Sequence, residues 1–180
     1  MNAWRAQIRG IENLQPEMMA AMREGRRAGL ESLGSKGVDM VQENITTPYD
    51  GKPAAVCFGN LAGSINSVFE ELPDAARVIV GVGPQLGADK YAAPVETGAV
   101  PHMPPPDALI PWVMKKFDIE DGKDALSAAF AVAMSIRKKG TQGHEMFSRA
   151  LTDLEPLAVP VLEHEIALAF ERFGFTAVTA

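Results

Sequence analysis

The chain has 180 residues, enough for one domain with a core of its own, and 47% hydrophobic with 22% charged residues is ordinary for a globular protein. Its formal net charge of -6 argues against a protein that grips the phosphate backbone of a nucleic acid. Basic residues form only two small clusters, at 23–27 and 137–139, which we expect to be solvated helix faces or protein contacts.

Targeting and redox signals predict a soluble, unexported protein. The single cysteine, Cys57, excludes an internal disulfide and fits synthesis in a reducing compartment such as the bacterial cytoplasm. The first ten residues lack the continuous apolar core of a secretory signal. The longest uncharged helical run, residues 125–136, is shorter than the roughly 20 residues that a membrane span needs.

A long helix is predicted from Pro16 to about Thr46, since proline is well tolerated in a first helical turn. Its apolar residues follow a stripe of threes and fours, and three glycines share that stripe. Each glycine costs a helix about 1 kcal/mol relative to alanine. Small residues on one stripe therefore predict either a tightly packed neighbour or a break near residues 34–35. The glycines are Gly25, Gly29 and Gly37.

The middle of the chain is predicted to form an antiparallel sheet. The valine-rich run at 76–83 is the strongest strand, and residues 64–72 and 54–58 also have strand-like stretches. Residues 4–9 alternate apolar and polar side chains as a half-buried strand does, although they also fit a helical face. After a second turn comes the proline-rich stretch 89–106, which we interpret as a loop of rigid shape.

Three helices are predicted in the last third of the chain. The first covers residues 108–117 with Asp107 as its cap, and the second covers residues 125–139. On the second helix, four residues share the face expected to be packed: Leu126, Ala129, Phe130 and Ala133. The last helix is expected from about residue 155 to 173.

The sequence contains only weak motifs for catalysis, cofactor binding or metal binding. Residues 78–87 place two glycines after a strand, but the third glycine of a dinucleotide-binding turn comes one position late, and we expect no helix to follow. His102, His144 and His164 form no H-E-x-x-H motif, and Cys57 lies between apolar neighbours typical of packing. We therefore expect no catalytic residue, cofactor or metal. The alternative from another class is a small bacterial hydrolase or metal enzyme using Cys57 or the histidines.

Five sequence elements occur in a characteristic order. They are G-N-L-x-x-S-I at 59–65, V-G-V-G-P at 80–84, Y-A-x-x-V-E-x-G at 91–98, P-H-M-P-P at 101–105 and R-K-x-G-T-x at 137–142. In order and spacing, over most of its length, the chain resembles the tail-component or neck-protein family of long-tailed bacteriophages. That family usually continues with Arg-Pro-Phe, whereas residues 143–147 here are Gly-His-Glu-Met-Phe, so the contact of the usual arginine has no matching residue.

The resemblance implies a virion structural protein without enzymatic activity. It would form a homo-oligomeric ring at the head–tail junction, expected to be hexameric, as a neck or tail-completion protein. Its neighbours would be the head-closure ring and the tail terminator or tail tube. DNA would pass through without specific binding, and no membrane would be contacted. The protein would be made in the host cytoplasm and end up in the virion. A tail terminator that caps the tube is the alternative within assembly.

The resemblance also marks residues for assembly or loop structure. Glu96 would accept backbone amides in its own loop or form an ion pair between subunits, and we favour the first role. The full set is Gly59, Asn60, Leu61, Ser64, Tyr91, Glu96, Gly98, Pro104, Pro105, Trp112 and Arg137. For the whole chain, residues 1–180, we expect a single α+β domain. A long N-terminal helix and a C-terminal helix would pack on an antiparallel sheet of about four strands, with a two-helix insertion at about 104–139.

Overall fold

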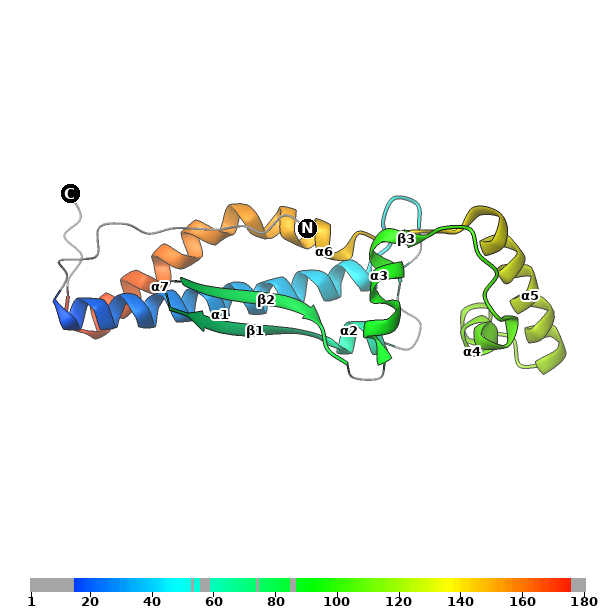
Figure 1. Ribbon diagram of the computed structural model, residues 1–180, viewed down its shortest axis with the longest axis horizontal. Helices are drawn as coiled ribbons and strands as arrows, with labels where there is room; N and C mark the ends of the chain where they lie inside the picture. The colour runs from blue at the N-terminus through cyan, green and yellow to red at the C-terminus, as the bar shows by residue number, and fades with distance from the viewer. Residues whose placement is uncertain (1–14, 53, 56–58, 74, 85–86, 176–180) are drawn as a thin grey trace. The chain divides into compact units, whose positions relative to one another are not determined.

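A computed structural model describes residues 15–52, 54–55, 59–73, 75–84 and 87–175. These residues fold as a mixture of helices and short antiparallel sheets, as expected for the α+β class (Figure 1). The chain divides into two compact units. Unit 1 comprises Met1–Gly34, Val68–Ile79 and Pro156–Ala180, and unit 2 comprises Ser35–Ser67 and Val80–Glu155.

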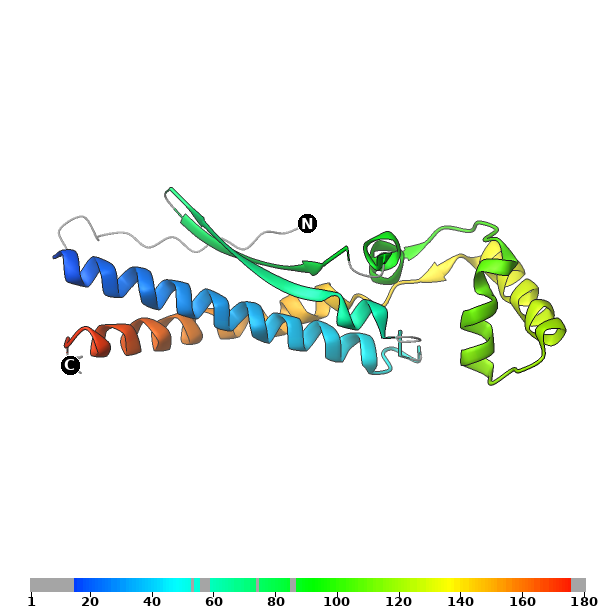
Figure 2. The ribbon, with the colours of Figure 1, turned by 90° about the horizontal axis from the view of Figure 1, so that it is seen from below.

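Helix α1 (Pro16–Thr46) begins and ends where the sequence predicts and continues without a break past Gly34. In unit 1 it packs against α7 (Ala158–Arg172), and the two helices lie side by side in Figure 2. A Cβ atom added at Gly25 would lie 2.5 Å from Cα of Ile166, and one at Gly29 would lie 2.8 Å from Cδ2 of Leu162. The glycine stripe therefore serves a closely packed neighbour, which was one of the two predicted explanations.

Strands β1 (Ile65–Leu72) and β2 (Ala75–Val82) pair as a hairpin. Both follow their predictions, because β-branched and aromatic side chains favour the extended chain. A second two-stranded sheet pairs β3 (Gly98–Ala99) with β4 (Thr141–Gln142). The single sheet of about four strands is not confirmed. Its other two expected strands, 4–9 and most of 54–58, lie outside the described residues.

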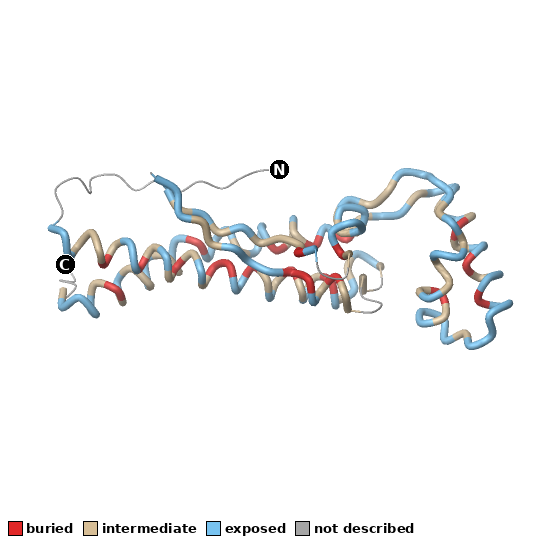
Figure 3. The backbone as a smooth tube through the Cα atoms, turned by 60° about the horizontal axis from the view of Figure 1, so that its bottom comes forward, coloured by how far each residue is buried: buried red, intermediate tan, exposed pale blue. Residues whose placement is uncertain are grey.

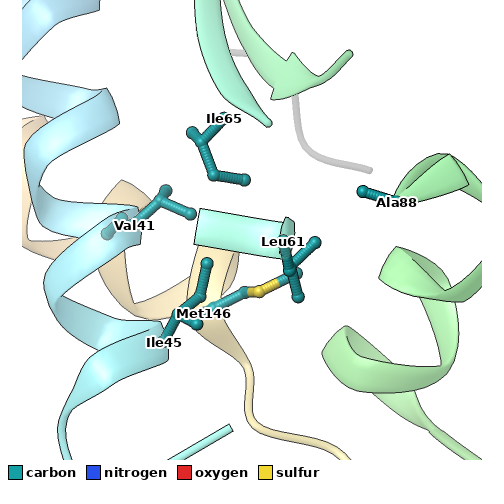
Figure 4. Packing of buried hydrophobic residues seen from close by; sticks show 7 residues of the cluster. Val41, Ile45, Leu61, Ile65, Ala88 and Met146 are labelled. Atoms are coloured by element: carbon teal, nitrogen blue, oxygen red, sulfur yellow. The ribbon is translucent and has the colours of Figure 1, made fainter. Parts of the chain in front are cut away.

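Unit 2 has a core of apolar side chains drawn from distant parts of the sequence (Figure 4). Val41 and Ile45 come from α1, and Leu61 from the one-turn helix α2 (Asn60–Gly63). Met146, at the start of α6 (Met146–Leu154), extends its thioether towards Ile45 and Leu61. Each of these four side chains is at least 95% buried. Burial of such side chains stabilises a fold by roughly 1.5–3 kcal/mol each, so this cluster is a main source of stability for unit 2.

The stretch 89–106 is not a loop throughout, which corrects the prediction. Its first half forms helix α3 (Asp89–Thr97), although Pro94 lies inside it. Proline removes one N–H from a helix, but a helix of nine residues has few intrahelical bonds to lose. Gly98 ends the helix with φ 79° and donates its N–H to the carbonyl of Pro94. Residues 100–105 remain without regular structure.

Helices α4 (Pro106–Phe117) and α5 (Gly122–Lys139) pack against each other as a helical hairpin, where two helices are predicted. The N-cap of α4 is Pro105, so Asp107 lies inside the helix and does not cap it. Asp121 caps α5 by accepting the N–H of Lys123 at 2.7 Å and of Asp124 at 3.1 Å. The hairpin joins the rest of unit 2 through the two segments that carry β3 and β4.

The buried face of α5 is confirmed for Ala129 and Ala133 but is shifted away from Leu126 and Phe130. Ala125, Ala129 and Ala133 are fully buried, whereas Leu126 is 45% and Phe130 53% exposed. In Figure 3 the buried residues of α5 are isolated segments on an otherwise accessible helix. A stripe of alanines at every fourth position allows close helix contact, so the bulky side chains fall on the neighbouring, outward face.

The C-terminal part is also divided more finely than predicted. The helix expected from about 155 to 173 begins at Ala158 and ends at Arg172, after a short 3-10 helix, η2 (Glu155–Leu157). Helix α6 had no counterpart among the predicted elements.

Candidate functional site

The element at 59–65 is a structural corner. Gly59 adopts φ 79°, a left-handed conformation that glycine tolerates best, and precedes α2. Leu61 points into the core of unit 2, and Ser64 is 2% exposed. The Ser64 hydroxyl donates to the carbonyl of Asn60 at 2.7 Å, and its own carbonyl accepts the N–H of Gly83 at 2.8 Å. These residues turn the chain from α2 into β1.

Glu96 accepts backbone amides, as favoured, but those of α6 and not those of its own segment. Its carboxylate accepts the N–H of Phe147 at 2.9 Å and both the N–H and the hydroxyl of Ser148, at 3.0 and 2.8 Å. The residue before α6, Glu145, has φ 52° and gives no side-chain cap. Glu96, at the end of α3, therefore satisfies free amides in the first turn of α6, and its negative charge interacts favourably with the helix dipole there.

The two segments leading to the helical hairpin cross at very close range. Gly98 and Gly140 both have positive φ, 79° and 70°. A Cβ at Gly98 would lie 2.8 Å from the N of Gly143, and one at Gly143 would lie 2.9 Å from the N of Gly98. Only glycine allows this backbone approach, which explains Gly98, Gly140 of the 137–142 element and Gly143 directly after it.

Two cations tie the 49–52 turn to α6 and to the segment before it, contacts that the sequence does not predict. Asp50 and Gly51 both have positive φ, as a two-residue hairpin turn of the Asp-Gly type requires. The guanidinium carbon of Arg149 lies 4.0 Å from the ring centroid of Tyr49, and Lys52 Nζ donates to the carbonyl of Gly143 at 2.8 Å. The Asp-Gly pair at 50–51 was a usable signal for the turn.

Beside this turn lies a hollow of about 390 Å³. Its lining is polar and of mixed charge: Asn44, Tyr49, Glu145, Ser148, Arg149, Thr152 and Asp153. One Nη of Arg149 donates to the carbonyl of Asn44 at 2.8 Å, and Asn44 donates to the carbonyl of Met146 at 3.0 Å. These bonds hold α1 and α6 together, so the described contacts of the hollow are structural.

The remaining expected residues are spread over unit 2. Tyr91 is 37% exposed on α3, and partial burial raises the pKa of its hydroxyl. Pro104 is half-buried and Pro105 exposed at the start of α4. Trp112 packs edge to face against Phe117, with ring centroids 5.8 Å apart. Arg137 is exposed in the last turn of α5.

The described residues bring no chemical cluster together. No group of three or more His, Cys, Asp or Glu among them could hold a metal ion. His102 is exposed, with Nδ1 2.9 Å from the carbonyl of Val100, and His164 is exposed on α7. His144 is 9% exposed and donates its N–H to the carbonyl of Val95. Cys57, the other candidate, lies outside the described residues.

Exposed apolar side chains occur in several places among the described residues, and two of these surfaces combine them with charged neighbours. On the helical hairpin, a hollow of about 580 Å³ is lined by Pro106, Asp107, Lys123, Leu126, Ser127 and Phe130. On the β1–β2 hairpin, Val68 is 51%, Leu72 40% and Ile79 42% exposed. We call these the α4–α5 hollow and the β-hairpin ridge. Period-2 alternation could have indicated the ridge, whereas the hollow depends on which side of α5 packs.

Comparisons with known proteins add no assignment: no family model, curated protein or solved structure matches this chain. Within the described residues, no helix is long and apolar enough to cross a membrane. The role of the two surfaces therefore rests on their own geometry.

Proposed function

We propose that this protein is a virion structural protein that forms a homo-oligomeric ring at the head–tail junction of a tailed phage or phage-like particle. It acts there as a neck or tail-completion protein. The ring is six-fold, to match a tail tube, and its neighbours are the head-closure ring and the tail terminator or tail tube. The proposal retains a sheet of about four strands.

The observation that carries the proposal is the outward apolar face of α5. Leu126 and Phe130 are half exposed although α5 offers a continuous alanine face to α4. Exposed apolar residues that gather around a hollow mark a surface for another protein more often than a solvated face. The hairpin is also connected through two short strands whose glycines permit very close backbone contact, which suits the presentation of a docking element.

The β-hairpin ridge supplies a second, different surface. Rings are closed by head-to-tail contacts, in which each subunit offers two unlike patches to its two neighbours. An extended strand pair and a helical hairpin, each with exposed apolar side chains, meet this requirement. A protein in a two-fold dimer needs only one such patch, so the pair of surfaces favours a ring.

Electron microscopy of a lysate from a phage with this gene disrupted tests the function. Loss of a neck protein should leave DNA-filled heads beside free tails of normal length, because finished parts are no longer joined. Overlong tails would move the assignment to the tail terminator, which stops tube growth. Intact infectious virions would rule out both roles.

A further inference from the structure

The α4–α5 hollow combines an apolar centre with one charge of each sign. Leu126 and Phe130 come from one face of α5, and Pro106 closes the hollow from the start of α4. The charges are Asp107 on α4 and Lys123 on α5, both exposed. Neither makes a side-chain ion pair within the described residues, so both are available to a partner.

The β-hairpin ridge has the matching composition. The Ser64–Gly83 hydrogen bond and the Glu70–Arg77 ion pair set a register in which Val68 lies opposite Ile79. Side chains two residues apart share a face of a strand, so the Glu70–Arg77 pair follows Val68 and Ile79 on the same face. Leu72 continues the ridge towards the turn. The ridge thus offers branched apolar side chains beside one acid and one base.

We propose that the ridge of one copy of this chain docks into the hollow of a second copy. Val68 and Ile79 would meet Leu126 and Phe130, with Arg77 directed to Asp107 and Glu70 to Lys123. Both halves of the contact are present on one chain. Each half carries one acid and one base, Glu70 with Arg77 on the ridge and Asp107 with Lys123 at the hollow, so the charges can exchange partners across the contact, which favours a second copy over an unrelated partner. This inference rests on the proposed ring and names the surfaces that join its subunits.

The contact is of the kind that assembles a chain of subunits. Because the two patches differ, each added copy leaves one free ridge and one free hollow, and growth ends only when a ring closes. A stable interface usually buries about 1,200–2,000 Å², which is more than a few side chains provide. The ridge and the hollow therefore form the apolar centre of a larger contact between subunits. Self-association of the isolated protein is therefore expected to depend strongly on concentration.

Sedimentation equilibrium of the purified full chain tests the contact. Protein concentrations up to about 1 mM are used, so that a dissociation constant as weak as about 1 mM is still detected. Leu126→Glu should raise the dissociation constant about tenfold or more, because it places a charge in the apolar centre. Leu151→Glu is the matched control, since Leu151 and Leu126 are both 45% exposed and only Leu126 lines the hollow. Combining Leu126→Glu with Ile79→Lys should restore part of the affinity. Circular dichroism of each variant verifies the fold.

Cross-linking distinguishes this head-to-tail contact from a symmetric one. In a Cys57→Ala background, the double variant Val68→Cys with Phe130→Cys should give a ladder of multimers with a short bis-maleimide. Each single variant should stay monomeric.

Dimers from either single variant, a monomer at all concentrations, or association unaffected by Leu126→Glu would each overturn the inference. None of these results would exclude a neck role, which the gene disruption decides separately.

Discussion

At Gly25 of α1 the backbone of α7 leaves no room for a methyl group. Gly25→Ala would bring a Cβ within 2.5 Å of the Cα of Ile166, a backbone atom that cannot move without the helix. We expect the free energy of unfolding to fall by about 1–3 kcal/mol, despite the better helix propensity of alanine. Urea denaturation followed by circular dichroism measures it. Gly122→Ala, with no atom within 4 Å of the added Cβ, should be neutral, and an equal loss there would contradict the packing explanation.

Glu96 caps α6 although it lies about fifty residues earlier in the sequence, because the residue before α6 provides no side-chain cap. Glu96→Ala leaves the amides of Phe147 and Ser148 without this acceptor and should lower stability by about 1–2 kcal/mol. Glu96→Gln keeps one acceptor oxygen, so its stability should lie between that of the unchanged protein and that of Glu96→Ala. Thermal unfolding compares these variants with Glu120→Ala in the exposed turn, which we expect to change stability by less than about 0.5 kcal/mol. If Glu96→Ala matches Glu120→Ala, the cap contributes nothing measurable.

At the scale of elements, the same substitution should affect stability differently on the two faces of α5, the buried alanine face and the exposed face. Ala129 is fully buried, whereas Ala131 on the same helix is exposed. Ala129→Leu should destabilise the protein by about 1–3 kcal/mol, because Ala129 is fully buried and a larger side chain there must displace its neighbours. Ala131→Leu adds the same atoms to the same helix and should be nearly neutral. Denaturant unfolding of both variants measures the difference, and equal effects would argue against the alanine seam.

The sequence predicts an element best where its signal is local. Pro16 and the proline loop after Thr46 mark the ends of α1, and the valines of β2 favour a strand in any setting. Helix α3 was not predicted because Pro94 suggests a loop. In the folded chain Gly98 ends α3, and Glu96 of α3 accepts amides of α6. Helix α6 was not predicted either, since its amides are satisfied by a residue of another helix.

Choice of face was the least predictable feature. On α5, helical spacing puts Ala125, Ala129 and Ala133 on one stripe and Leu126 with Phe130 on the next. Transfer from water favours burial of the larger side chains, which is why the sequence predicts that they are buried. The close approach of α4 selects the alanines instead. This shift of the buried face depends on the partner helix, and the proposed assembly surface follows from it.

At the scale of the whole molecule, the helical hairpin is separable from the core of unit 2. None of the buried core residues of that cluster lies between 100 and 140. Strands β3 and β4 pair Ala99 directly with Thr141, so the two ends of the hairpin are already neighbours. A two-residue Asn-Gly turn between them would convert the pair into an ordinary β-hairpin. The α4–α5 module can therefore be removed by design without opening the rest of the fold.

Replacement of residues 100–140 by Asn-Gly should yield a protein that still unfolds cooperatively, because the Val41, Ile45 and Met146 cluster is intact. It should no longer self-associate and, when it is the only copy in an infected cell, should give free heads and tails. Circular dichroism with thermal melting checks the fold, and sedimentation and electron microscopy check assembly against the full-length chain. If the shortened protein melts without cooperativity, α4 and α5 belong to the folding unit. If it associates normally, the ring contact lies elsewhere and the β-hairpin ridge must pair with a different surface.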